Sequence, residues 1–250
     1  MYNRILSLAP SNTEILFALG LGDRIAGVTT FCDYPGAAGK IPKAGSWIHV
    51  RDMEKIRKLN PDLILTSMYV PPAVKEWAEK NNVRLVNLFP QTLKGVYDSF
   101  MMIGVLTGTG TKAKEIVSDV KLEIGRIQEL AQRKRPKIYT EEFHRPPTVA
   151  GNWVPELIKA AGGIPMIKGG KLSPEVTLKQ VEKFDPDIII LHWCGFHDKS
   201  KKEDLLKRGW RNLRAVKEKK VFAVDDTFLN RPGPRIWKGA RLIQDIIRKA

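Results

Sequence analysis

The hydrophobic positions of the chain follow one pattern twice. The stretch MEKIRKLNPDLIL (residues 53–65) carries apolar residues at helical spacing, then an Asn-Pro-Asp break, then an apolar run. The stretch LKQVEKFDPDIII (residues 178–190) repeats that order 125 positions later. Spacings of three are typical of one helix face, and a Pro-containing break before a short apolar run predicts a strand. Each copy is therefore predicted to be a helix followed by a strand, with Asp52 and Thr177 as N-caps.

A second pair of stretches extends the repeat. EILFALG (residues 14–20) resembles ELIKAAG (residues 156–162), and each follows an extended, proline-containing segment. Ser11 and Glu14 have the spacing of a capping box, and Asn152 is an N-cap type ahead of the second helix. The final glycine of each stretch predicts a helix C-terminus. The chain is therefore predicted to form two related α/β halves, since a solenoid would repeat every few tens of residues.

One long helix is predicted between the two halves. Its apolar residues recur at spacings of three and four and form one stripe: Ile116, Val120, Ile124, Ile127 and Leu130. Pro136 is predicted to stop the helix. We expect an N-terminal lobe over residues 1–109, a bridging helix over 110–135 and a C-terminal lobe over 136–250. Little relative motion is expected, because a helix is stiffer than a Gly/Ser linker.

The charge balance is strongly basic. The 250 residues include 42 Lys and Arg against 27 Asp and Glu, a formal net charge of +15. Runs such as DKSKKEDLLKRG and VKEKK are typical of solvated faces; attraction to anionic lipid headgroups, nucleic acid or an anionic ligand is the functional alternative. The sequence has no zinc-finger spacing, RNP-like aromatic strand or Gly-rich phosphate loop. We therefore expect no nucleic-acid partner.

The cysteines and the start of the chain bear on its compartment. Cys32 and Cys194 are too few for a disulfide framework and too far apart for a local metal motif, so we expect two reduced thiols. No window has the ~18 uninterrupted apolar residues of a membrane span. The first residues pass directly into the strand-like ILSL, without a signal peptide or lipobox. We expect a periplasmic or cell-surface protein if the N-terminus was trimmed, and a cytoplasmic one if Met1 is native.

A series of segments spanning nearly the whole chain carries a family resemblance. In order they are RILSLAPSNTEILFALGLGDRIAGVT, CDYP, GSW, DMEKIRKLNPDLIL, the bridging helix, VAGNWVPELIKAAGG, LKQVEKFDPDIII and VFAVDDTFLNRPGPRI. The chain resembles the substrate-binding proteins of ABC importers for cobalamin, haem and ferric siderophores. GNWVPEL, WCGF and NRPGPR are most similar to the cobalamin-binding branch.

The resemblance implies a specific fold and role. The fold would be two similar Rossmann-like α/β lobes bridged by one long α-helix, with a ligand cleft between the lobes. The role would be to bind a metal chelate, a corrinoid such as cobalamin first and haem or a ferric siderophore as alternatives, and to deliver it to an importer permease. We also expect a monomer that is not an enzyme and requires no cofactor.

Aromatic residues gather in the segments that follow predicted strands. Ligands in open α/β sheets bind beyond the carboxyl ends of the strands, and a flat macrocycle such as a corrin or porphyrin needs broad rigid faces. The ligand-binding candidates are Cys32, Tyr34, Trp47, Tyr69, Phe143, Trp153, Trp193, Cys194, Phe228 and Arg231. The resemblance implies ligand-facing aromatics at Trp47 and at Phe228, which replaces a Trp of the best-known family member. The alternative for each ring is a packing role.

The sequence also contains residues whose side chains can coordinate the metal of a bound chelate. A thiolate or imidazole can be an axial ligand to cobalt or iron, and haem also accepts Tyr. The residues that keep axial ligation open are His192, His197, Cys32, Cys194, Tyr34, Tyr69 and His144. A lone His in a loop is more often a hydrogen-bonding residue, so we expect no metal site built by the protein itself.

Enzymatic alternatives find little support in the sequence. It has no Gly-x-Ser-x-Gly elbow, no His-Glu-x-x-His and no nucleotide loop. Glu141 and Glu142 are adjacent in a predicted strand, so their carboxylates should point to opposite faces. A tetrapyrrole metal chelatase is the enzyme alternative, and an intracellular corrinoid carrier without a permease is the other alternative.

Permease docking offers a sharper residue-level prediction. The resemblance implies one surface glutamate on each lobe that meets permease arginines, and the first falls on Glu54. Its mate in the repeat is Lys179, a reversal of charge that would place like charges together. Glu175 and Glu182 lie one helical turn to either side and are possible substitutes.

Overall fold

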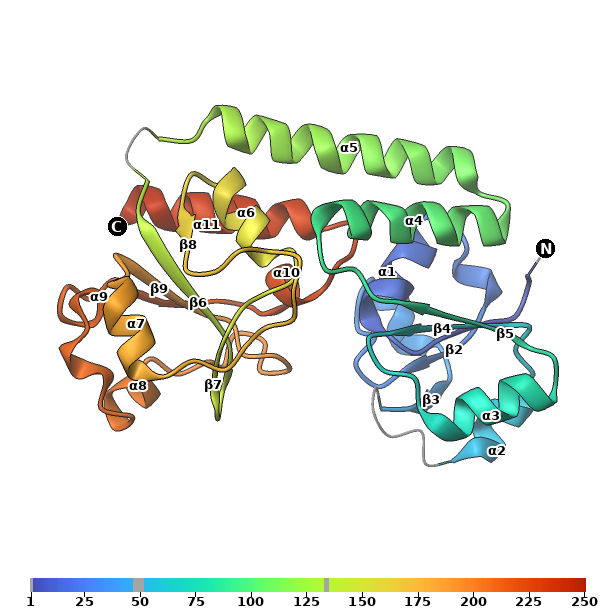
Figure 1. Ribbon diagram of the computed structural model, residues 1–250. Helices are drawn as coiled ribbons and strands as arrows, with labels where there is room; N and C mark the ends of the chain where they lie inside the picture. Colours follow the sequence, from blue (N-terminus) through green and yellow to red (C-terminus); the bar gives the residue numbers. More distant parts are fainter. Residues whose placement is uncertain (1, 47–51, 133–134) are drawn as a thin grey trace. The chain divides into compact units, whose positions relative to one another are not determined.

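Two β-sheets organise the chain, each in its own unit of the computed structural model (Figure 1). The structure describes residues 2–46, 52–132 and 135–250. We name the units the first lobe (Met1–Phe89 with Tyr97–Ser118) and the second lobe (Pro90–Val96 with Asp119–Ala250). The boundary falls inside two helices rather than at residues 109 and 135, so the long helix belongs partly to each lobe.

The first lobe is built on a parallel sheet. Its strands are β1 (Ile5–Ser7), β2 (Ile25–Thr29), β3 (Lys43–Gly45), β4 (Leu63–Ser67) and β5 (Arg84–Leu88), in the spatial order β3-β2-β1-β4-β5. Every pairing in it is parallel. Its helices are α1 (Pro10–Ala18), η1 (Gly22–Arg24), η2 (Gly36–Lys40), α2 (Met53–Leu59), α3 (Pro72–Lys80), most of α4 (Leu93–Thr107) and the start of α5 (Gly110–Glu129). The order is that of a doubly wound sheet, as predicted.

The second lobe repeats the parallel core with one antiparallel addition. Its strands are β6 (Lys137–His144), β7 (Pro147–Val149), β8 (Ile164–Pro165), β9 (Ile188–Leu191) and β10 (Val221–Ala223), in the order β10-β9-β6-β7, with β8 also pairing β6. Only β7 runs antiparallel among these pairings. Its helices are α6 (Val154–Ala160), α7 (Leu178–Phe184), α8 (Glu203–Lys207), η3 (Trp210–Asn212), α9 (Arg214–Lys217), α10 (Thr227–Asn230) and α11 (Ile236–Lys249).

The repeat read from the sequence is present in the backbone. Helices α2 and α7 each have seven residues, and each begins at a side-chain N-cap, Asp52 or Thr177. Each ends at a residue in the left-handed region, Asn60 (φ 42°) or Asp185 (φ 49°), and each is followed by a central parallel strand. The prediction of two related α/β halves is therefore confirmed.

Three local predictions were wrong. Ser11 lies inside helix α1, which starts at Pro10 without a side-chain cap, so no capping box forms there. Asn152 adopts φ 51° and precedes the N-cap of α6, which is Trp153. Helix α5 ends at Glu129 rather than at residue 135, because Ile127 is its last buried apolar residue and the side chain of Leu130 is exposed.

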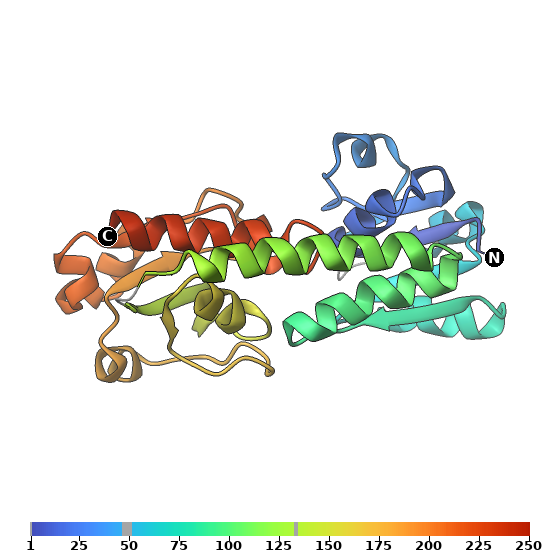
Figure 2. The same ribbon diagram turned by 90° about the horizontal axis from the view of Figure 1, so that it is seen from above.

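Helix α4 was not anticipated by the sequence reading. It lies beside α5 in both views (Figures 1 and 2), and Gly104 brings the helices close: a Cβ there would lie 2.6 Å from the Cβ of Ala113. Farther along α5, the Gln244 Nε2 of α11 donates to the Ile127 carbonyl at 2.6 Å. Within the described ranges, no helix has the length and apolarity needed to cross a bilayer.

A buried ion pair fixes one side of the second sheet. Glu141 is fully buried; its carboxylate accepts hydrogen bonds from Tyr139 Oη (2.8 Å), Trp193 Nε1 (2.9 Å) and Arg208 Nη2 (3.0 Å to each oxygen). The Arg208 guanidinium also lies 4.3 Å from the centre of the Trp210 ring. Satisfying a buried carboxylate in this way offsets the cost of removing it from water.

We predict that Arg208→Met destabilises the protein by about 3 kcal/mol, because Glu141 would keep a buried charge without its counter-ion. Denaturant unfolding measures the change. Arg211→Met is the matched control, since Arg211 is exposed, and its effect should stay within about 0.5 kcal/mol. The double variant Glu141→Gln/Arg208→Met should recover part of the loss. Equal losses for Arg208→Met and Arg211→Met would contradict the assignment.

Candidate functional site

The carboxyl ends of the first-lobe strands carry a set of exposed apolar side chains. All five strands are parallel, so the segments that follow them lie along one edge of the sheet. Large residues there are between 41% and 49% exposed: Phe31 and Tyr34 after β2, Met68 and Tyr69 after β4, and Phe89 after β5. We name these five residues, four with aromatic rings and one methionine, the aromatic edge. Exposed apolar side chains gathered in this way usually mark a binding surface.

Cys32 explains how the loop after β2 presents its aromatic residues. Its side chain is buried, and its Sγ lies 3.2 Å from the hydroxyls of both Thr13 and Thr29. Its backbone N–H donates to the Thr29 carbonyl at 3.1 Å. The buried thiol therefore anchors the turn, while Phe31 and Tyr34 stay exposed. The prediction that Cys32 contacts ligand is corrected: it positions the loop instead.

The loop after β4 reaches the same edge through a strained turn. Met68 has φ 66°, an uncommon value for a bulky residue, and Tyr69 N–H donates to the Ser67 carbonyl at 2.7 Å. Met68 N–H donates to the Leu88 carbonyl at 3.3 Å, which ties the turn to β5. Strained backbone of this kind is concentrated at functional sites. The turn holds Met68 and Tyr69 beside Phe89, the residue that follows Leu88.

The corresponding edge of the second lobe combines aromatic rings with polar groups. His144 stacks on Trp193 with ring centres 4.3 Å apart, and Phe196 meets both rings edge-on at 5.3 and 5.6 Å. Phe143 and Phe196 are exposed, whereas Trp193 is buried. The exposed Phe196 ring therefore packs against a fixed pair of rings, which keeps its position defined.

Glu142 and Cys194 lie on the opposite face of this sheet edge from Glu141. The Ser173 hydroxyl donates to Glu142, and the same hydroxyl accepts from Gly151 N–H at 2.8 Å. Burial raises the pKa of Glu142, and Asp226 adds to the increase while Ser173 opposes it. The prediction that the carboxylates of Glu141 and Glu142 do not converge is confirmed.

The loop after β9 is held by Asp226. Its carboxylate oxygens accept from the backbone N–H groups of Gly195 (2.9 Å) and His197 (2.8 Å). His197, Asp225 and Asp226 offer ligand atoms within 4.8 Å of one another, the one such group among the described residues. Because Asp226 already accepts two backbone N–H groups, its role here is to hold the loop.

Three further ligand predictions change once burial is known. The ring of Trp193 is 1% exposed, and its Nε1 is bonded to Glu141. The Trp153 ring is also buried, and its Nε1 donates to the Leu229 carbonyl at 2.9 Å. Both tryptophans are therefore packing residues of the second lobe. Cys194 is partly buried, and burial followed by the charge of Glu142 raises the pKa of its thiol to about 12, so it is not a thiolate ligand.

The remaining predicted ligand-binding residues differ in how exposed they are. Tyr34, Tyr69 and Phe143 are exposed at strand ends. Phe228 is half-buried, with the Arg235 guanidinium 5.5 Å from its ring centre, and Arg231 is half-buried nearby in sequence. Trp47 lies outside the described residues. Sequence reasoning missed Met68 and Phe89, although both follow strands and the rule that found Tyr69 would have found them.

His192 is closed off from any ligand. It is fully buried, and its Nδ1 lies 2.6 Å from Asn230 Oδ1, while Asn230 Nδ2 donates to the His192 carbonyl at 3.0 Å. The amide orientation makes Nδ1 the donor, so Nε2 carries the lone pair; it has no hydrogen-bond partner among the described residues. Burial lowers the pKa of His192 to about 4. Axial ligation by His192 is therefore excluded.

Comparison with known proteins shows to which family this chain belongs. A model of the periplasmic binding protein family matches residues 5–227. The chain belongs to the periplasmic binding protein family. Its resemblance to substrate-binding proteins of ABC importers is thereby confirmed, as is the prediction of a binding protein rather than an enzyme.

Individual relatives of this periplasmic binding protein cover nearly all of it. The uncharacterized ABC transporter substrate-binding lipoprotein YvrC of Bacillus subtilis is 31% identical over 256 residues, 98% of this chain and 79% of that protein. The vitamin B12-binding protein of Vibrio parahaemolyticus is 26% identical over 238 residues, 93% of this chain and 84% of that protein. The periplasmic haem-binding protein RhuT of Roseiflexus sp. RS-1 has a TM-score of 0.83 at 25% identity, covering 98% of this chain and 99% of RhuT.

We predict that the binding protein loses about 3 kcal/mol of stability as pH falls from 6.5 to about 4, because unfolded His192 takes up a proton that the folded state excludes. The contribution is fully present above pH 6.5 and is lost on acidification. Denaturant unfolding across this range, compared between wild type and His192→Gln, measures it. A His192→Gln slope equal to that of wild type would show that another group is responsible.

Proposed function

We propose that this protein binds a corrinoid, with cobalamin as the first candidate, and delivers it to an ABC importer permease. The observation that carries the proposal is the aromatic edge of the first lobe, where five large apolar side chains stay exposed at the ends of parallel strands. A flat macrocycle covers such side chains with little loss of side-chain entropy. The similarity to a vitamin B12-binding protein, over 93% of this chain and 84% of that protein, supports a corrinoid.

Haem is the second candidate, and one observation favours it. Tyr34 and Tyr69 expose their side chains on the aromatic edge, and a phenol oxygen is an established ligand for haem iron. The similarity to a haem-binding protein gives further support. A corrinoid would use the same two residues as apolar faces, so removing only the hydroxyl separates the candidates.

We predict that cyanocobalamin or cobinamide quenches the tryptophan fluorescence of the protein in a tight one-to-one titration, and that haemin binds weakly. Tyr69→Ala should weaken corrinoid binding at least about tenfold, because an apolar face is lost. Tyr69→Phe should leave corrinoid affinity nearly unchanged. Met102→Ala is the control, since Met102 is an exposed large apolar residue that lies on α4 rather than in a segment following a strand.

Other outcomes of this titration reassign the ligand. Tight haemin binding that Tyr34→Phe or Tyr69→Phe abolishes would replace the corrinoid with haem. Absence of binding by all three compounds would move the ligand to a ferric siderophore or another chelate. Unchanged corrinoid affinity in Tyr69→Ala and Phe31→Ala would contradict the assignment of the aromatic edge.

We further propose that Glu54 docks on the permease. Its side chain is 62% exposed in the first turn of α2 and is paired only with Arg57 of the same turn, at 2.9 Å, among the described residues. An exposed pair of this kind contributes little to stability, so Glu54 is free to exchange partners. Lys179 occupies the equivalent position of α7, and the second lobe therefore needs a different contact.

We predict that Glu54→Lys reduces ligand uptake by the reconstituted transporter several-fold and leaves the affinity for the ligand unchanged. The reason is that a lysine would repel a basic pocket on the permease. The matched control is Glu79→Lys, at a glutamate that is 67% exposed on α3. Intact uptake by Glu54→Lys would remove the docking claim without affecting the proposed ligand.

A further inference from the structure

One segment of the second lobe carries a large share of the positive charge. Residues 197–220 contain ten Lys and Arg against four Asp and Glu, within a chain whose formal net charge is +15. The segment includes α8, η3 and α9, which bury Leu205, Trp210 and Leu213 against the sheet. Eight of its ten Lys and Arg residues are exposed; Arg208 and Lys220 are half-buried.

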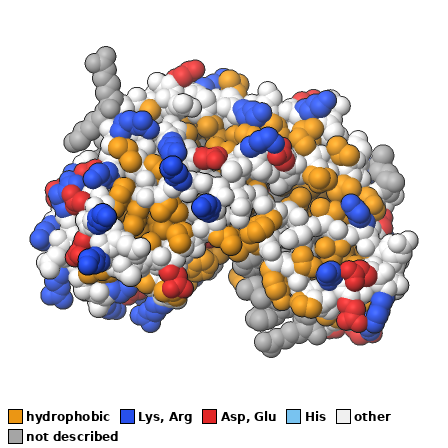
Figure 3. All heavy atoms as spheres, viewed as in Figure 1, with side chains coloured by type: hydrophobic (Ala, Val, Ile, Leu, Met, Phe, Trp, Pro, Cys, Tyr) orange, Lys and Arg blue, Asp and Glu red, His pale blue; other side chains and the backbone are white. Residues whose placement is uncertain are grey.

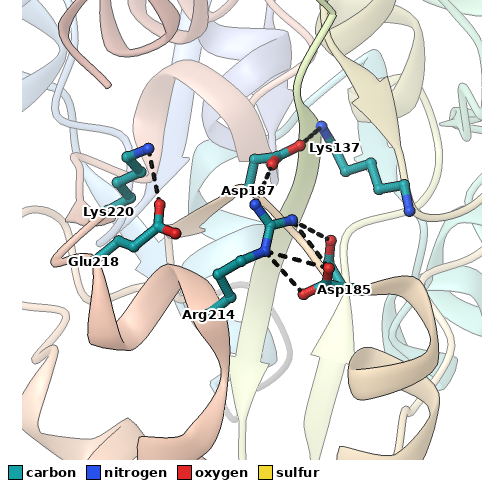
Figure 4. A network of polar contacts seen from close by, with 6 residues as sticks. All are labelled: Lys137, Asp185, Asp187, Arg214, Glu218 and Lys220. Atoms are coloured by element: carbon teal, nitrogen blue, oxygen red, sulfur yellow. Dashed lines mark hydrogen bonds and ion pairs between the residues drawn. The ribbon is translucent and has the colours of Figure 1, made fainter.

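Part of this charge is neutralised within the lobe. Four of the ten cations are held in ion pairs: Arg208 with Glu141, Arg214 with Asp185 and Asp187, Lys207 with Asp204, and Lys220 with Glu218. Figure 4 shows Arg214 between the two aspartates, with Lys220 and Glu218 close by. The Arg208 and Arg214 pairs tie the segment to the rest of the lobe, whereas the Lys207 and Lys220 pairs lie within the segment.

The other six cations are exposed and make no ion pair with the described residues: Lys199, Lys201, Lys202, Arg211, Lys217 and Lys219. We name them the basic patch. Only Asp198 and Glu203 remain as unpaired acids in the same segment, so the patch keeps an excess of positive charge. Lys and Arg side chains are prominent over the part of the second lobe where α8 and α9 lie (Figure 3).

An exposed leucine lies within the basic patch. Leu206 of α8 is 44% exposed, whereas the preceding residue, Leu205, is buried. Cations around an exposed apolar residue match the boundary between lipid headgroups and acyl chains.

We propose that the basic patch binds the surface of an anionic lipid bilayer. Five of its six cations are lysines, which bind as hydrated point charges and suit a diffuse layer of headgroups. Nucleic-acid sites instead combine arginine with exposed aromatic rings on which bases stack, whereas Trp210, the one Phe, Tyr or Trp in residues 197–220, is buried. The interaction is independent of the ligand and of permease docking.

Vesicle sedimentation with the full chain tests the proposal. The protein should pellet with vesicles containing phosphatidylglycerol and stay in solution with pure phosphatidylcholine, and added salt should release it. Lys199→Gln/Lys201→Gln/Lys217→Gln should lower the partition coefficient roughly a hundredfold, at about fivefold per charge. The control triple variant Lys114→Gln/Lys159→Gln/Lys249→Gln removes the same charge from exposed positions elsewhere and should change it much less.

Three results would overturn the proposal. They are no binding to phosphatidylglycerol vesicles, equal losses in the two triple variants, and release of the protein from vesicles by a stoichiometric amount of duplex DNA. The last result would make the patch a nucleic-acid site. Corrinoid titration of both triple variants should match wild type, so failure of membrane binding and failure of the proposed ligand are told apart.

Discussion

The carboxylate that follows each helix-to-strand turn is the constraint on which both sheets depend. Asp62 accepts the backbone N–H groups of Asn3 (2.8 Å) and Arg4 (3.0 Å), which sets β4 beside β1. Asp187 accepts the N–H of Lys137 at 2.7 Å, which sets β9 beside β6 (Figure 4). A shift of register by one residue would lose these bonds and turn every side chain to the other face. The repeated Pro-Asp pair thus fixes the two central strand pairs.

Parallel pairing around these strands decides which residues meet at the edge of each sheet. Because parallel strands end at one edge, residues far apart in sequence, such as Phe31 and Phe89, come to the same border of the first sheet. Buried groups underneath hold the loops: the Cys32 thiol in the first lobe and the Asp226 carboxylate in the second. If the edge binds the proposed ligand, loops held in this way need little ordering on binding, which favours affinity for a flat, rigid molecule.

The two lobes share a parallel sheet core but differ in the strands and side chains added to it. The second lobe adds the antiparallel strand β7 and places Glu141 in a buried network with Tyr139, Trp193 and Arg208. The first lobe has instead an entirely parallel sheet and an edge of exposed apolar side chains. The second sheet is therefore held by a buried polar network that the described residues of the first sheet do not share.

The sequence by itself determined the repeat of two α/β halves, because hydrophobic spacing and turn residues act locally. The detailed fold and the family came from the resemblance of whole segments to known substrate-binding proteins. The sequence also separated Glu141 from Glu142, since adjacent strand residues alternate between faces. Only the tertiary structure decided which aromatics are exposed: Trp153 and Trp193 found partners for their Nε1 groups inside the second lobe, whereas Met68 and Phe89 did not become buried. Burial depends on contacts between segments distant in the chain, and no local pattern contains that information.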